Sequence, residues 1–127
     1  MARGKTSRPT DRELTILRIL WDSGPSTVRH VNDAMNEDSQ TGYTTTLKLM
    51  QIMTDKGLLR RDDSQFKHIF EPALTEEKAQ KQLVGDLLER AFSGSAEKLV
   101  MRALSAKTIS AEELASIRKM LDEFEGE

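Results

Sequence analysis

Residues 43–72 read YTTTLKLMQIMTDKGLLRRDDSQFKHIFEP, and their pattern changes from helical to strand-like at Gly57. Before this glycine, apolar residues recur every three or four positions, which predicts an amphipathic helix over 43–56. A glycine suits the left-handed conformation that ends a helix. After it, the pattern predicts two short strands and the polar turn that joins them, at 58–61, 66–70 and 62–65 respectively.

Two further helices are predicted ahead of this stretch. A capping box at 10–13 begins the first, which runs to about Asp22 and stops at the Gly-Pro pair 24–25. Ser26 or Thr27 begins a second, short helix. Three helices followed by a two-stranded hairpin are typical of a winged helix-turn-helix domain, whose third helix enters the major groove of DNA.

The C-terminal part predicts three short helices with apolar stripes. Helices this short bury too little apolar surface to be stable alone. They could pack on the first half, but packing against a second copy is favoured, because a dimer reads a palindromic site. The residues assigned to this dimer contact are Leu83, Leu87, Leu88, Leu99, Val100, Leu104, Leu114, Ile117 and Leu121.

The expected fold class is therefore mainly α with a small β-hairpin. A flexible basic arm is predicted over 1–9, a winged helix-turn-helix DNA-binding domain over 10–72, and a helical dimerisation domain over 73–127.

Length and composition set limits on function. The chain has 127 residues, no cysteine and a net charge of −2. The absence of cysteine excludes a disulfide scaffold, a cysteine nucleophile and a zinc finger. No run of four apolar residues occurs, so we expect a soluble, cytoplasmic protein without a membrane segment. The near-neutral charge argues weakly against nucleic acid, so any DNA-binding face must come from the local placement of cations.

The third predicted helix carries the candidate base-reading residues. Thr44 and Thr45 in its first turn can contact phosphates and thymine methyl groups, although hydroxyl residues also serve simply to start helices. Lys48 and Gln51 lie one turn apart on the outer face, where they can reach guanine and adenine or remain solvated. Tyr43 either packs at the helix start or contacts a phosphate.

The hairpin carries the second group of candidates. Arg60, Arg61 and Lys67 flank its tip, and strand alternation places the two arginines on opposite faces. One of them should face DNA if the wing grips the backbone; the alternative is a basic edge that deters strand pairing. Asp62 and Asp63 at the tip argue against deep insertion into the minor groove.

Arg29, on the second helix, has two interpretations as well. It can touch a phosphate or pair with Asp33 four residues on. Catalysis is disfavoured, because His30 and His68 lie on different elements and no glycine-rich phosphate loop occurs. A metal site built from His30 and nearby carboxylates is also disfavoured. We expect no enzyme activity and no cofactor.

Several strings in this order resemble the penicillinase-repressor family of bacterial regulators, the BlaI/MecI/CopY group. They are Leu14-Thr15-Ile16-Leu17, Leu20-Trp21, Gly24-Pro25-Ser26-Thr27-Val28-Arg29, Tyr43-Thr44-Thr45, Lys56-Gly57-Leu58-Leu59 and the terminal leucine-rich helix. The resemblance covers about residues 9–125. It implies a homodimeric repressor that binds a palindromic operator through the winged helix and dimerises through the C-terminal helices.

The chain departs from the family in two respects. Some members are cut by a membrane sensor-protease at an Asn-Phe bond, and Arg102-Ala103 stand in the equivalent stretch here. The copper-responsive branch uses C-terminal cysteines, which this chain lacks. The resemblance therefore leaves the inducing signal, and any upstream sensor or protease, unidentified.

The predicted function is a sequence-specific DNA-binding repressor. A rival is a winged-helix protein-interaction module without DNA binding, which would expose apolar residues such as Leu47 and Ile52 on the third helix. A third possibility is a ligand-sensing regulator with a pocket at the dimer interface, which requires converging polar groups.

Overall fold

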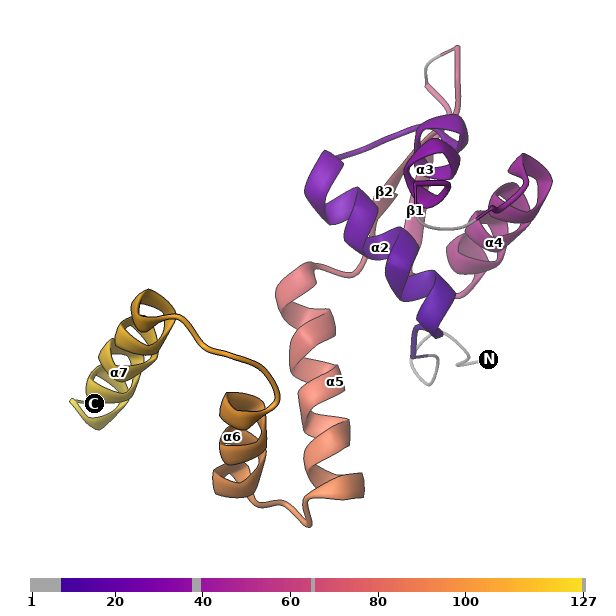
Figure 1. The fold of residues 1–127 in the computed structure, drawn as a ribbon. Helices are drawn as coiled ribbons and strands as arrows, with labels where there is room; N and C mark the ends of the chain where they lie inside the picture. Colours follow the sequence, from indigo (N-terminus) through magenta and orange to yellow (C-terminus); the bar gives the residue numbers. More distant parts are fainter. Residues whose placement is uncertain (1–7, 38–39, 65, 127) are drawn as a thin grey trace. The chain divides into compact units, whose positions relative to one another are not determined.

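The computed structural model describes residues 8–37, 40–64 and 66–126 (Figure 1). Its elements in chain order are α2 (Asp11–Ser23), α3 (Val28–Met35), α4 (Tyr43–Asp55), β1 (Leu59–Asp62), β2 (Ile69–Pro72), α5 (Glu76–Ala91), α6 (Ala96–Ser105) and α7 (Ala111–Glu125). The predicted fold class, mainly α with one small β-hairpin, is confirmed. The predicted basic arm falls mostly on residues 1–7, outside the described residues.

The chain divides into two compact units, and the boundary falls within α5, after Lys81. The N-terminal unit contains α2, α3, α4 and the hairpin. Its core is built from the inward faces of these elements: Ile16, Leu17, Leu20, Val28, Val31, Met35, Met50, Met53, Leu58, Leu59 and Phe70. The buried side of α4 is the one that its helical period predicts, and Thr46, Met50 and Met53 on this side are fully buried. At 100° per residue the spacing places Leu49 on the same side, but Leu49 is only half-buried.

Capping interactions begin the helices where the sequence predicts them. The Thr10 hydroxyl accepts from the Glu13 amide at 3.2 Å, and the Glu13 carboxylate accepts from the Thr10 amide at 3.0 Å, which completes the capping box. Thr27 caps α3 by accepting from the His30 amide. Glu13 has a second role, because its buried carboxylate also binds Lys56 Nζ at 2.7 Å and so joins the start of α2 to the end of α4.

The hairpin is shifted relative to the prediction. Its antiparallel strands pair Leu59 with Pro72 and Asp62 with Ile69, so Asp63, Ser64 and residues 66–68 lie outside the ladder. The physical reason is that Asp63 accepts from both Arg61 and His68, and side chains rather than ladder hydrogen bonds hold this loop. Ser26 extends the sheet by exchanging backbone hydrogen bonds with Phe70 at 3.0 and 2.8 Å.

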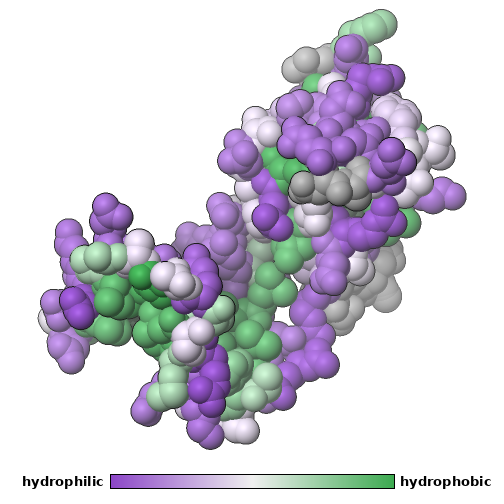
Figure 2. Space-filling view, in the orientation of Figure 1, coloured by the Kyte–Doolittle hydropathy of each residue, from purple (hydrophilic) through white to green (hydrophobic). Residues whose placement is uncertain are grey.

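The C-terminal unit is helical, and its apolar side chains are largely uncovered. Ser93 and Gly94 both have positive φ and end α5, and Ser95 and Ser110 cap α6 and α7. No residue of α6 or α7 is buried. Figure 2 shows hydrophobic side chains gathered on the visible surface of this unit. No helix in the part of the chain that the structure describes is long and apolar enough to span a membrane.

Candidate nucleic-acid interface

The outer face of α4 is polar and accessible. Thr44, Thr45, Lys48 and Gln51 are all exposed, whereas Thr46 on the opposite side is fully buried. None of these four exposed side chains has a hydrogen-bond or ion-pair partner among the described residues. Their donors and acceptors are therefore available to a ligand along one side of the helix.

The first turn of α4 is held by α3. Gly42 occupies the N-cap and offers no side-chain acceptor. In its place, the Asn32 side-chain amide, oriented so that its nitrogen meets the surrounding acceptors, brings this nitrogen to 2.9 Å from the Thr41 carbonyl oxygen, 3.3 Å from the Gly42 carbonyl oxygen and 2.6 Å from the Thr46 hydroxyl. Asn36 Oδ1 accepts from the Thr41 amide at 2.6 Å. Sequence reasoning missed this contact, although two asparagines one turn apart before a glycine could have signalled it.

A groove of about 680 Å³ lies between α3, α4 and the hairpin. Four of the predicted DNA-binding residues line it, namely Tyr43, Gln51, Arg61 and Lys67. Thr44, Thr45, Lys48 and Arg60 are not part of its lining. The groove also contains charged or titratable side chains outside the predicted set: Arg29, His30, Asp33 and His68.

Arg29 and Tyr43 form a stacked pair at the edge of this groove. The guanidinium carbon of Arg29 lies 5.3 Å from the centroid of the Tyr43 ring, within cation–π distance. Arg29 thus does not pair with Asp33, the alternative that helical spacing left open. The ring of Tyr43 remains 43% exposed, so the tyrosine packs on one face only.

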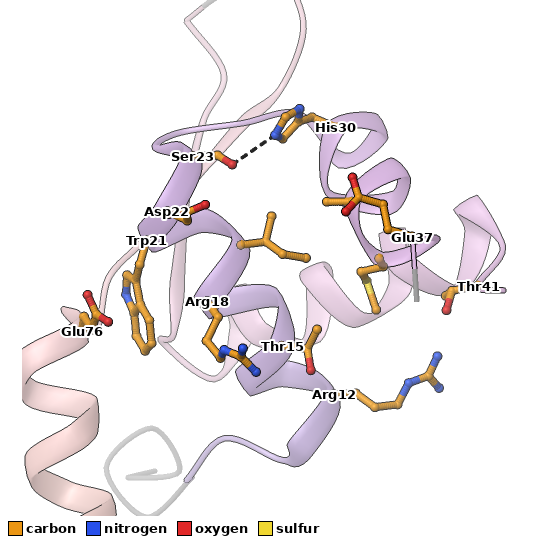
Figure 3. Close-up of a pocket in the computed structure, with 13 residues that line it drawn as sticks. Arg12, Thr15, Arg18, Trp21, Asp22, Ser23, His30, Glu37, Thr41 and Glu76 are labelled. Atoms are coloured by element: carbon orange, nitrogen blue, oxygen red, sulfur yellow. Dashed lines mark hydrogen bonds between the residues drawn. The ribbon is translucent and has the colours of Figure 1, made fainter. Parts of the chain in front are cut away.

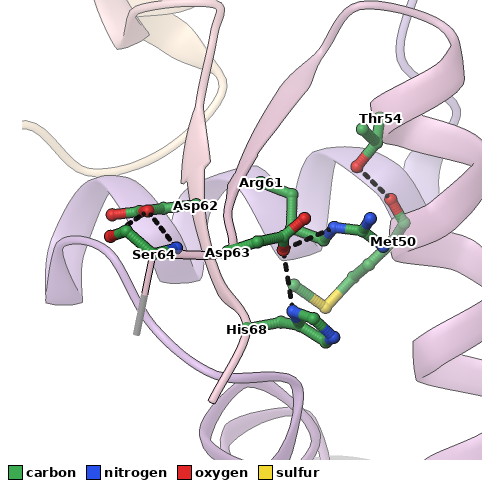
Figure 4. Close-up of polar contacts among 7 residues, drawn as sticks. All are labelled: Met50, Thr54, Arg61, Asp62, Asp63, Ser64 and His68. Atoms are coloured by element: carbon green, nitrogen blue, oxygen red, sulfur yellow. Dashed lines mark hydrogen bonds and ion pairs between the residues drawn. The ribbon is translucent and has the colours of Figure 1, made fainter. Parts of the chain in front are cut away.

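The two hairpin arginines have different partners. Arg61 Nε donates to Asp63 at 2.8 Å, and His68 Nδ1 lies 2.7 Å from the same carboxylate (Figure 4). Arg60 Nε instead pairs with Glu71 across the strands at 3.3 Å. The predicted alternation therefore places only Arg61 toward the groove, with part of its charge offset by Asp63.

Asp62 is engaged within the hairpin loop. Its Oδ1 accepts from the Ser64 hydroxyl at 2.6 Å and from the Ser64 amide at 2.9 Å. These hydrogen bonds, the hydroxyl first, favour the charged form and hold the pKa of Asp62 below its ordinary value.

A second groove, of about 800 Å³, lies between α2 and α3, and His30 contributes to the lining of both grooves (Figure 3). Its charges are mixed, with Arg12 and Arg18 beside Asp22, Glu37 and Glu76. His30 Nε2 lies 3.2 Å from Ser23 Oγ. No group of three or more metal-binding side chains occurs among the described residues. The mixed charge makes this groove a poorer anion site than the one beside α4.

The predicted dimer residues differ in exposure. Leu87, Val100 and Leu121 are exposed, and the other six are half-buried. Several other exposed apolar residues lie outside the predicted set: Val84, Met101, Met120 and Phe124. The methionines continue the apolar stripes of α6 and α7, which is the signal that could have identified them.

Comparison with known proteins agrees with this architecture. The family model described as penicillinase repressor matches residues 9–123. The transcriptional regulator BlaI of Mycobacterium tuberculosis, in strains CDC 1551 / Oshkosh and ATCC 25618 / H37Rv, is 27% identical to this chain over 123 residues. The match covers 95% of this chain and 88% of each relative. A winged-helix fold, a polar outer face on α4 and a family match over nearly the whole chain lead to one conclusion: the protein belongs to the penicillinase repressor family of transcriptional regulators.

Proposed function

We propose that this protein is a DNA-binding transcriptional repressor that acts as a homodimer on a palindromic operator. The observation that carries the proposal is the position of the polar face of α4 beside the cation-lined groove. A helix fits the major groove of B-DNA, which is about 12 Å wide. Membership in a family of repressors supports the same function.

In this proposal α4 reads bases and the hairpin grips the backbone. Lys48 can donate to guanine O6 or N7, and Gln51 can bind adenine bidentately. Thr44 and Thr45 are close to the helix start, where hydroxyl groups can bind phosphate or contact a thymine methyl. Tyr43 and the hairpin cations Arg60, Arg61 and Lys67 complete the predicted contact set.

The homodimer is supported by the uncovered apolar side chains of α5, α6 and α7. Leu121 is 56% exposed and Phe124 is 76% exposed, although both belong to an amphipathic helix. A second copy would cover such a surface with a symmetric patch. The two copies of α4 would then lie about 34–36 Å apart, or a multiple of this distance, to meet successive major grooves.

Repression follows if the bound dimer occupies a promoter and excludes polymerase. No catalytic step is required of this chain, and the described residues of the α4 face have the chemistry of recognition rather than of bond cleavage.

The test is a titration of the full-length protein against its own upstream intergenic DNA, with an unrelated duplex of equal length as competitor. Two chains per site should bind the upstream DNA far more tightly than the competitor. With about 6–10 phosphates neutralised per dimer, affinity should fall about 10³–10⁵-fold between 50 and 200 mM salt. Sedimentation gives the stoichiometry. Absence of binding to either duplex at low salt would refute the proposal and favour a protein-docking role for α4, of which the exposed Ile52 would be part.

A further inference from the structure

We propose that the groove between α3, α4 and the hairpin seats one sugar–phosphate strand of the DNA, with Arg29, stacked on Tyr43, as its phosphate ligand on the α3 side. The inference rests on the proposed function and deepens it. It selects one of the two roles that the sequence left open for Arg29 and joins α3 to the binding surface predicted on α4 and the hairpin.

The groove lies between the helix and the hairpin that are proposed to bind DNA. A helix in the major groove and a hairpin reaching the adjacent minor groove must lie on either side of the strand that separates the two grooves. The groove described above occupies this position in the protein, because Tyr43, Leu47 and Gln51 of α4 form one wall and Arg61 and Lys67 lie on the hairpin side.

The lining of the groove carries an excess of positive charge. The described lining residues include three permanent cations, Arg29, Arg61 and Lys67, but a single carboxylate, that of Asp33. Arg61 is partly neutralised by Asp63. Arg29 forms no ion pair with any carboxylate that the structure describes, so its charge is available to a phosphate.

Apolar side chains also line the groove. Val28, Leu47 and Phe70 supply buried or half-buried apolar surface. Phe66, whose side chain is fully exposed, borders the same groove. Cations above an apolar base suit a sugar–phosphate strand, whose phosphate oxygens accept hydrogen bonds while its deoxyriboses present C–H groups.

The stack on Tyr43 explains why Arg29 is suited to this role. A guanidinium on an aromatic face keeps its edge N–H groups free for bidentate binding of an oxyanion. The ring also limits the rotamers of a long side chain, so less conformational entropy is lost when phosphate binds. The pair therefore presents a fixed donor at the edge of the groove.

The first test compares two charge-neutralising variants of the full-length protein. Arg29→Gln should weaken binding to operator and unrelated DNA by similar factors and lower the magnitude of the salt slope by about 0.9 per chain. Arg18→Gln is the matched control, because Arg18 is exposed on α2 and lines the second groove, between α2 and α3. An unchanged slope for Arg29→Gln, or an equal change for Arg18→Gln, would overturn the inference.

The second test replaces single phosphates of the operator with neutral methylphosphonates. Wild-type protein should lose affinity when one particular phosphate of each half-site is neutralised. The affinity of Arg29→Gln should not depend on that phosphate. Tyr43→Phe, which keeps the ring, should retain this sensitivity, and Tyr43→Leu should reduce it. If wild-type protein binds DNA but no phosphate is coupled to Arg29, the inference alone fails. If wild-type protein binds no DNA, the proposed function fails as well.

Discussion

Exposed polar side chains in the N-terminal unit belong to two groups, those that bind other protein groups and those that do not. Asp62 and Asp63 at the hairpin belong to the first, since Ser64, Arg61 and His68 donate to them. Lys48 belongs to the second, with no ion-pair partner among the described residues. Residues of the second group are the better candidates for DNA contacts, because a ligand does not have to displace an existing partner.

Lys48→Ala tests the base-reading role of α4. We expect operator binding to weaken by about 1–3 kcal/mol, with preference lost at one base position, because a bidentate contact to guanine discriminates by this amount. Binding to a set of single-base operator variants measures it. Lys78→Ala, at an exposed lysine of α5, is the control. A loss that is uniform over all variants would assign Lys48 to the phosphate backbone instead.

The lowered pKa of Asp62 gives a pH prediction. Its folded pKa lies below the ordinary value, so its contribution to loop stability is present above that value and is lost as pH falls through the folded pKa. Ser64→Ala removes the largest cause and should raise the Asp62 pKa toward the ordinary value. A carboxyl ¹³C NMR titration measures the change, and Glu71 in the same spectra is an internal reference. Equal pKa values for Asp62 in both proteins would contradict this account.

At the scale of elements, the position of α4 depends on α3. The Asn32 side-chain amide lies within hydrogen-bond distance of two carbonyls of the α3–α4 turn and of the Thr46 hydroxyl, and the residue is buried. An apolar replacement would remove this donor from the buried Thr41 carbonyl and from the Thr46 hydroxyl, whereas the Gly42 carbonyl would still accept from the Thr46 amide. The orientation of the predicted recognition helix is therefore set by a residue that is not itself in the contact face.

Asn32→Leu should lower the free energy of unfolding by about 1–3 kcal/mol, since buried acceptors lose their partner. It should also reduce the ratio of operator affinity to nonspecific affinity, because α4 loses its fixed start. Denaturant unfolding and paired binding titrations measure the two effects. Thr46→Val, which removes one hydroxyl and leaves the two carbonyl contacts, should do less. Equal effects of the two substitutions would show that the carbonyl contacts contribute little.

At the scale of the whole molecule, the two units differ in how much they bury. The N-terminal unit encloses a core of aliphatic, methionine and phenylalanine side chains, whereas α6 and α7 enclose none. An amphipathic helix without a covered apolar face gains little from burial. In the proposed homodimer, self-association through the C-terminal helices buries these apolar faces.

Leu121→Lys tests this proposal. If Leu121 is buried between two copies, the lysine pair should raise the dimer dissociation constant by about 100-fold or more, because two charges would be desolvated without partners. Sedimentation over a concentration series measures the constant. Ser116→Lys places a similar charge at an exposed polar position of the same helix. An unchanged dissociation constant for Leu121→Lys would show that Leu121 is not part of the dimer interface.

The sequence predicted much of the local structure, because local signals are sufficient for it. The Thr10–Glu13 capping box, the left-handed Gly57 that follows α4 and the buried positions Thr46, Met50 and Met53 all follow from signals within or next to one element. The DNA-binding and dimerisation residues remain predictions of the same kind, since they were chosen by helical face and residue chemistry.

Contacts between segments distant in the sequence needed the tertiary structure. Spacing left open a pair of Arg29 with Asp33 or a phosphate contact, and the fold places Arg29 over the ring of Tyr43. Pattern placed residues 66–68 in a strand, whereas Arg61 and His68 converge on Asp63 and make them a loop. The helices, their caps and the family could be predicted from the sequence, since these depend on residues close along the chain. The groove could not be predicted in this way, because it brings together side chains of α3, α4 and the hairpin, and Arg29 meets Tyr43 from another helix.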